Sequence, residues 1–343
     1  MTVRTEAARR RAAAGQRAGE GSGEEGAAPG AGPAAVVFPG QGTQQPGMGR
    51  PWRDTPSWAL VKEIGGWTGV DAEALLLTAD ADELRRTDRA QLAVFALEVV
   101  VHAEAERAGV LDEVAGYAGH SLGEFAALYA AGAIGLRACA LLVAERGAAM
   151  HEASAVTPGT MTALMGEAVA DGGGERLAAE CRAAGHEVWV ANLNSPQQVV
   201  LSGTVAGVEA AERAAGGLAL RCARLEVGGA FHSPLMLAAE KRLRAALAET
   251  PFADPSAPVV SGVDGRAHAE GTEWRELMAD QLTGAVRWEE GVRTLAGPLG
   301  ARRVLELGPG RTLSGLCARI APELPAQSIR TPDRLAELRR EAR

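Results

Sequence analysis

Short apolar runs bounded by turn residues alternate along the chain with longer stretches rich in helix-forming residues. Such runs predict buried strands, and outside residues 158–227 they lie at residues 35–38, 114–118, 259–261 and 304–307. Strands that are separated by helical stretches are typical of an α/β fold. The pattern therefore predicts an α/β domain built on a parallel core sheet.

A different order of elements is predicted between residues 158 and 226. The pattern favours a strand at 161–165, a helix at 175–184, strands at 188–192 and 198–202, a helix at 206–215 and a strand at 221–227. This β-α-β-β-α-β order is that of the ferredoxin-like arrangement. We therefore expect a ferredoxin-like subdomain, residues 158–227, inserted into a larger α/β domain of residues 34–157 and 228–325.

The two ends of the chain are expected to lie outside this core. Residues 1–33 are rich in Ala, Gly, Glu and Arg and lack the apolar segment of a secretory signal, which predicts a flexible tail. Residues 326–343 are expected to form a C-terminal tail or helix. The chain contains no run of about 18 apolar residues, so a membrane span is not expected.

The segment Gly-His-Ser-Leu-Gly, residues 119–123, lies between a predicted strand and a predicted helix. This is the context of a nucleophile elbow, in which glycines remove side chains that would collide at a sharp turn. Ser121 is therefore a candidate nucleophile. The turn also directs the N–H group of Leu122 and the positive end of the helix at the place where an oxyanion would form.

A serine nucleophile needs a base, and His232 is the histidine best placed to supply one. It follows the predicted strand at 221–227 and the glycine pair Gly228-Gly229, which lets the backbone turn, while Pro234 can open a helix. A neutral imidazole on such a turn can take the serine proton and later return it. The other histidines are interpreted as structural or solvated, and His120 is expected to point away from Ser121.

Composition and charge argue against some classes of function. The 343 residues are 47% hydrophobic, enough for a substantial core and about two domains, and the formal net charge is −8. That charge argues against nucleic-acid binding, which needs clustered Lys and Arg. Four cysteines lie far apart without metal-ligand spacing, which predicts buried thiols, a reducing cytoplasm and no metal site.

Several separate segments together resemble the malonyl-CoA:acyl-carrier-protein transacylases and the acyltransferase domains of polyketide synthases. The resemblance runs from about Ala35 to about Ala318. It rests on residues 37–44, 47–49, 119–128, 146–150, 191–196, 202–203, 230–236, 281–288 and 307–310. Two departures are Gly284-Ala285, where the family usually has Ser-Pro, and Leu92, where it often has proline. The resemblance implies a large α/β-hydrolase-like domain with the site in the cleft beside the small subdomain.

The resemblance also implies catalytic roles. Ser121 would attack the thioester of an acyl-CoA, and His232 would be its base. The main-chain N–H groups of Gln41 and Leu122 would form the oxyanion hole, and the main-chain carbonyl of Gln281 would orient His232. A Ser–His dyad is implied, while a triad with an acidic residue stays open as the alternative.

Substrate recognition is implied in the same way. The guanidinium of Arg146 would clamp the free carboxylate of a malonyl-type group through two parallel hydrogen bonds. Phe231, directly before the histidine, resembles malonyl-specific members in which an aromatic wall leaves little room for a methyl branch. Gln91 and Asn192 are expected as further substrate-binding residues.

We therefore expect a cytoplasmic acyltransferase for fatty-acid or polyketide synthesis. It would move a malonyl group from malonyl-CoA to the phosphopantetheine thiol of an acyl carrier protein by a ping-pong route, without a cofactor of its own. Malonyl-CoA and the carrier protein are the expected partners, with no nucleic acid and no membrane, and a monomer is the family-based default. The alternatives are an acyl hydrolase of the same fold, an acyltransferase for methylmalonyl units, a carboxylesterase and an inactive carrier-binding scaffold.

Overall fold

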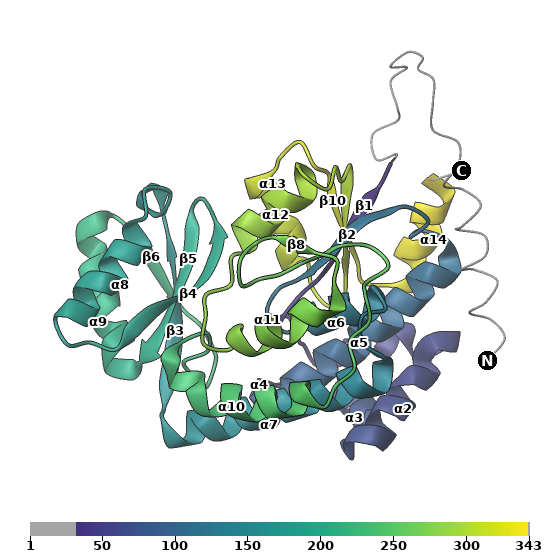
Figure 1. Ribbon diagram of the computed structural model, residues 1–343, viewed down its shortest axis with the longest axis horizontal. Coiled ribbons are helices and arrows are strands. Elements are labelled where there is room, and N and C mark those ends of the chain that lie inside the picture. The colour runs from purple at the N-terminus through teal and green to yellow at the C-terminus, as the bar shows by residue number, and fades with distance from the viewer. Residues whose placement is uncertain (1–31, 342–343) are drawn as a thin grey trace, which may run out of the picture. The chain divides into compact units, whose positions relative to one another are not determined.

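The computed structural model describes residues 32–341, so residues 1–31 of the expected N-terminal tail lie outside the described part. Its larger sheet has six strands in the order β10-β9-β1-β2-β7-β8 (Figure 1). The strands are β1 (Ala34–Phe38), β2 (Val114–Gly119), β7 (Val259–Val260), β8 (Ala267–His268), β9 (Arg303–Leu307) and β10 (Ala326–Ile329). All neighbours pair in parallel except β7 and β8, which are antiparallel. The chain therefore has an α/β fold with a mixed, mainly parallel sheet.

Helices pack on both faces of this sheet and against one another. They are α2 (Ala59–Thr68), α3 (Ala72–Leu77), α4 (Ala81–Arg85), α5 (Thr87–Ala108), α6 (Gly123–Ala130), α7 (Leu136–Val156), α10 (Leu237–Ala248), α11 (Trp274–Asp280), α12 (Trp288–Ala296), α13 (Thr312–Ile320) and α14 (Pro332–Glu341). Successive side chains of a strand point to opposite faces. Accordingly, Val36 and Phe38 of β1 pack in the core under α5, α6 and α7, whereas Ala35 and Val37 pack in the core that includes residues of α12 and α13.

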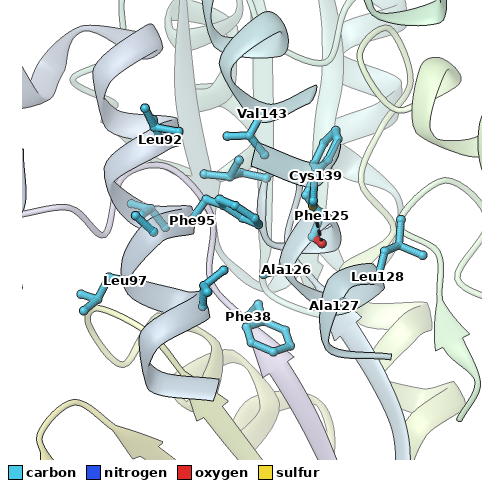
Figure 2. Packing of buried hydrophobic residues seen from close by; sticks show 14 of the residues in the cluster. Phe38, Leu92, Phe95, Leu97, Phe125, Ala126, Ala127, Leu128, Cys139 and Val143 are labelled. Carbon is cyan, nitrogen blue, oxygen red and sulfur yellow. Dashed lines mark hydrogen bonds between the residues drawn. The ribbon is translucent and has the colours of Figure 1, made fainter. Parts of the chain in front are cut away.

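The first of these cores holds the helix that follows Ser121. Figure 2 shows Phe38 of β1, Phe95 of α5 and Phe125 of α6 in one buried cluster, and each of the three side chains is fully buried. Cys139 of α7 donates a hydrogen bond from its Sγ to the carbonyl of Phe125 at 3.2 Å (Figure 2). The elbow therefore rests on a close-packed support, which limits its movement.

The second sheet has four antiparallel strands in the order β4-β5-β3-β6. Its elements follow the chain as β3 (Gly159–Met165), α8 (Gly173–Ala183), β4 (Val188–Ser195), β5 (Gln198–Thr204), α9 (Val205–Ala215) and β6 (Arg221–Arg224). The predicted order of strands and helices is thus observed. The two helices pack on one face of the sheet through a separate core that includes Leu177 and Val208.

Three expectations differ from the structure. The strand predicted at 221–227 ends at Arg224. The N–H of Leu225 still donates to the carbonyl of Met161 on β3 at 2.9 Å, and Leu225 and Val227 line a pocket. The C-terminal tail or helix expected from residue 326 begins instead with a strand, since β10 pairs with β9 before α14 starts. Cys222, expected to be buried, is exposed on β6, which lies at the edge of its sheet.

None of the helices in residues 32–341 has the length and apolar character that crossing a membrane requires.

Candidate active site

Ser121 lies at a sharp turn between β2 and α6. Its φ is 53°, a left-handed conformation that is uncommon for a residue other than glycine. The flanking glycines are required by close packing. A Cβ on Gly119 would lie 1.9 Å from the carbonyl carbon of Gly123, and one on Gly123 would lie 2.1 Å from the carbonyl oxygen of Phe38. The segment therefore has the strained strand-turn-helix geometry of a nucleophile elbow.

The loop after β1 lies directly against this elbow. The N–H of His120 donates to the carbonyl of Phe38 at 2.9 Å, and a Cβ on Gly40 would lie 2.5 Å from the carbonyl oxygen of His120. The next residue, Gln41, lines the same pocket as Ser121, and its Nε2 donates to Thr87 Oγ1 at 3.3 Å. Leu122 directly precedes α6. Both residues expected at the oxyanion hole thus lie on segments adjoining Ser121.

His232 contacts Ser121 although the two residues lie 111 positions apart in the chain. Its Nε2 lies 2.7 Å from Ser121 Oγ, and its Nδ1 lies 2.8 Å from the main-chain carbonyl oxygen of Gln281. A carbonyl can only accept, so Nδ1 carries the proton and Nε2 is free to accept the serine proton. The group that orients the imidazole is therefore a main-chain carbonyl, at the position where a triad would have a carboxylate.

Burial keeps His232 neutral. The side chain is 5% exposed, and burial, helped by the positive charge of Arg146, lowers its pKa to about 3. Its φ of 57° is again left-handed, so the turn after the glycine pair is strained in the same sense as the elbow. A neutral imidazole with a free Nε2 is the form that a general base requires.

Arg146 lies on α7 and is 1% exposed. Its Nη1 donates to Gln91 Oε1 at 2.6 Å, and its Nη2 donates to Ser121 Oγ and to Gln281 Oε1, each at 3.0 Å. Its Nε is buried without a hydrogen-bond partner among the described residues. Burial lowers the pKa of Arg146 to about 10, so the guanidinium stays charged at neutral pH. A buried cation with an unused donor is suited to binding an anion.

A pocket of about 310 Å³ opens above these groups. Ser121, His232 and Arg146 line it together with the predicted residues Gln41, Phe231 and Asn192. Gln91 has a different place. It lies behind Arg146, where its Oε1 accepts from the guanidinium and its Nε2 contacts Met150 Sδ at 3.2 Å. Gln91 therefore supports the arginine, and the expected direct contact with substrate stays a prediction.

Sequence reasoning missed two polar residues of the pocket wall. His120, which is expected to point away from Ser121, nevertheless lines the same pocket, packs near Trp288 and has Nε2 2.9 Å from Asn194 Oδ1. Asn194 lies on β4, so this contact joins the four-stranded sheet to the segment that holds Ser121. Burial lowers the pKa of His120, which favours a neutral ring there. Asn194 belongs to the segment 191–196, and the resemblance of this segment to the family is the only feature of the sequence that could have indicated it.

Residues 32–341 contain no group of three or more His, Cys, Asp or Glu side chains arranged to hold a metal ion.

Comparisons with known proteins identify the family of this chain. A family model described as "Acyl transferase domain" matches residues 35–313. The chain is 35% identical over 305 residues to the malonyl CoA-acyl carrier protein transacylase of Bacillus subtilis, covering 87% of this chain and 94% of that protein. It is 36% identical over 309 residues to the protein of the same name from Escherichia coli K12, covering 88% and 97%.

Solved structures of transacylases are also similar to this chain. An acyl carrier protein S-malonyltransferase from Vibrio cholerae superposes with a TM-score of 0.83 at 32% identity, covering 90% of this chain and 100% of that chain. A malonyl-transacylase solved in complex with a type II polyketide synthase acyl-carrier protein has a TM-score of 0.84 at 32% identity, covering 90% and 100%.

Proposed function

The chain belongs to the acyl transferase domain family, and we propose from this that it transfers a malonyl group from malonyl-CoA to the phosphopantetheine thiol of an acyl carrier protein. One observation carries the proposal. Ser121 Oγ lies within hydrogen-bond distance of both His232 Nε2 and Arg146 Nη2. A nucleophile, its base and a buried cation for a carboxylate therefore share one pocket.

In the first half-reaction, His232 takes the proton of Ser121 while Oγ attacks the thioester carbon of malonyl-CoA. The carbonyl oxygen becomes an oxyanion, which the main-chain N–H groups of Gln41 and Leu122 would stabilise. The tetrahedral intermediate then expels the sulfur of CoA, which receives the proton from His232. The products are free CoA and a malonyl ester on Ser121.

In the second half-reaction, the phosphopantetheine thiol gives its proton to His232 and attacks the ester carbon. Ser121 Oγ leaves and takes back a proton from His232, so the enzyme regains its starting form. Every transferred proton passes through Nε2, while Nδ1 keeps its proton and donates it in a hydrogen bond to the carbonyl of Gln281. This chemistry uses only the groups of this chain and of the two substrates.

Arg146 favours a malonyl group over a plain acyl group. Its unpartnered Nε offers one donor to the free carboxylate of the substrate. Nη2, which donates to Ser121 Oγ and Gln281 Oε1, would supply the second donor by releasing Ser121 Oγ. An acetyl group would leave this buried donor unpaired, which costs about 1–3 kcal/mol or more because the group is charged. The alternative of an acyl hydrolase for plain acyl groups gives the arginine no role and is not favoured.

Phe231 bears on the second alternative, a methylmalonyl substrate. The ring lines the pocket beside His232 and is 5% exposed. A methyl branch next to the thioester carbonyl would need room that this ring occupies. We therefore propose malonyl as the acyl group.

We also propose a division of the chain into two domains, with the site between them. We propose that residues 158–227 form a ferredoxin-like subdomain, supported by the strand order β4-β5-β3-β6, and that residues 34–157 and 228–325 form a hydrolase-like domain, supported by the elbow after β2. In this division Ser121 belongs to the hydrolase-like domain, and His232 lies at the start of the segment in which the chain re-enters that domain.

A transfer assay tests the proposal. The protein is mixed with labelled malonyl-CoA and either a holo carrier protein or the same carrier without its phosphopantetheine arm, and label on the carrier and free malonate are both measured. We expect rapid label on the holo carrier, none on the apo carrier and slow release of malonate. Fast release of malonate with no label on the holo carrier would instead identify a hydrolase.

A further inference from the structure

Glu124 is a buried carboxylate next to the site that the proposed mechanism does not use. It lies in the first turn of α6 and is fully buried. Its Oε1 accepts a hydrogen bond from the N–H of Gly262 at 3.2 Å, and its Oε2 accepts from Nε2 of Gln281. Both oxygens of Glu124 therefore face donors, and one of these donors belongs to the side chain of Gln281.

Gln281 connects the parts of the site through both its backbone and its side chain. Its main-chain carbonyl accepts from His232 Nδ1, and its side-chain Oε1 accepts from Arg146 Nη2. Its Nε2 donates to the carbonyl of Ser121 at 3.0 Å and to Glu124. The orientation of the amide group is therefore critical, since only one end can serve Arg146.

An amide group can rotate by half a turn, so its neighbours decide its orientation. A rotated Gln281 would direct Nε2 at the guanidinium of Arg146, where two donors would face each other, and Oε1 at the Ser121 carbonyl and at Glu124. A hydrogen bond to an ionised carboxylate is about twice as strong as one between neutral groups. Glu124 and Arg146 therefore fix the observed orientation together, because each is a charged group that bonds one end of the amide.

We propose that Glu124 is a positioning residue, which holds the Gln281 amide so that Arg146 and His232 are both correctly placed for malonyl transfer. This inference rests on the proposed function and deepens it. Glu124 touches neither the reacting atoms nor the pocket wall, so it acts through Gln281. Loss of Glu124 would therefore affect a malonyl substrate, which needs Arg146, more than an acetyl substrate.

The charge state of Glu124 matters for this role. The groups that face it are Arg146 from α7, the Ser261 hydroxyl and Gly262 N–H after β7, and Gln281 after α11. Burial raises the pKa of Glu124 to about 7, against the lowering effects of these hydrogen bonds and of Arg146. A protonated Glu124 would bring a third donor to a place where two donors already point. Only the ionised form suits the observed amide.

The test measures the first half-reaction alone, so that no acceptor thiol contributes to the pH dependence. Malonyl-CoA or acetyl-CoA is mixed with the protein for short times, the reaction is quenched, and the acyl-enzyme is measured from pH 5.5 to pH 9. The variant is Glu124→Gln, which keeps the shape of the side chain but offers one oxygen to two donors. Glu98→Gln is the matched control, because Glu98 is a fully buried carboxylate on α5 whose oxygens make no hydrogen bond to Gln281 or to any other described residue.

We expect the wild-type rate of malonylation to rise with pH through about 7, since His232 titrates far below this range. Glu124→Gln should lose this rise and should malonylate about 10²-fold more slowly at pH 8, with a smaller effect on acetylation. Glu98→Gln should keep the wild-type profile.

A Glu124→Gln protein that keeps the wild-type rate and pH profile would overturn the proposal, as would equal losses toward malonyl-CoA and acetyl-CoA. A flat profile for the wild type would overturn it even if the variant did not fold. If the wild type forms no malonyl-enzyme at any pH, the proposed function itself fails, so the two failures are distinguishable.

Discussion

Arg146 donates a hydrogen bond from Nη2 to Ser121 Oγ at 3.0 Å, so the cation proposed to bind the substrate carboxylate also contacts the nucleophile. The positive charge beside Oγ favours the serine oxygen as it loses its proton. The same charge helps to keep His232 neutral. Arg146 therefore affects both the chemistry and the choice of acyl group.

Replacing Arg146 with lysine should separate these two effects. Arg146→Lys keeps a positive charge but loses the planar fork that contacts Gln91 and Gln281. We expect kcat/KM for malonylation of Ser121 to fall about 10²-fold, with acetylation changed much less. Arg137→Lys, an exposed position on the same helix, is the control and should behave as wild type. An Arg146→Lys enzyme that keeps full preference for malonyl-CoA would contradict the assigned clamp.

Shortening Phe231 should relax the choice between malonyl and methylmalonyl groups. Phe231→Leu keeps an apolar wall but removes part of the ring that lines the pocket. One methyl group in a pocket changes binding by about 1–3 kcal/mol, so the ratio of methylmalonyl to malonyl acylation should rise about tenfold or more. Competition between the two CoA esters, read by mass spectrometry of the acyl-enzyme, measures this ratio. An unchanged ratio would mean that another part of the pocket excludes the methyl group.

His102 should make the fold sensitive to acid. It is buried on α5 among the rings of Phe38, Tyr117 and Tyr129, and burial lowers its pKa to about 4. Within residues 32–341 neither ring nitrogen has a hydrogen-bond partner, and a carboxylate oxygen of Glu106 lies 3.9 Å from Nδ1. Between pH 6.5 and 4 the unfolded chain binds a proton at this residue that the folded chain does not. The free energy of unfolding therefore falls as the pH drops through this range, by up to about 3 kcal/mol from this group.

His102→Leu removes this group while keeping an apolar side chain of similar size. The free energy of unfolding, measured with urea at pH 7 and at pH 4.5, should fall less for the variant than for the wild type. His120 and His232 also have lowered pKa values, so both proteins keep some acid sensitivity. Equal losses in the two proteins would show that His102 does not contribute.

The sequence allowed prediction of those site residues that belong to local patterns. Ser121 was found because glycines and a strand-helix boundary surround it, and His232 because a glycine pair and a proline mark its turn. Glu124 and Asn194 lie in recognisable segments, but their roles depend on Gln281 and His120, which are distant in the sequence. Such pairings arise only when segments far apart in the sequence come together in the fold, so no local pattern indicates them.

The same reasoning explains the errors in the fold. The strand β10, Ala-Gln-Ser-Ile, has little apolar character because it lies at the edge of its sheet and three of its four residues are only partly buried. Residues 225–227 have the apolar character of a strand, yet two of them line the pocket. An apolar pattern therefore indicates that residues are shielded from solvent. It does not tell whether they belong to a strand of a sheet or line a binding pocket.

The mass of the intact protein after brief incubation with malonyl-CoA tests the central claim most directly. The wild type should gain one malonyl group and lose it on addition of a holo carrier protein, whereas Ser121→Ala, with its helix and pocket otherwise unchanged, should gain none. A Ser121→Ala protein labelled as fully as the wild type, or a wild type that gains no malonyl group, would contradict the assignment of Ser121 as the nucleophile of a malonyl transfer.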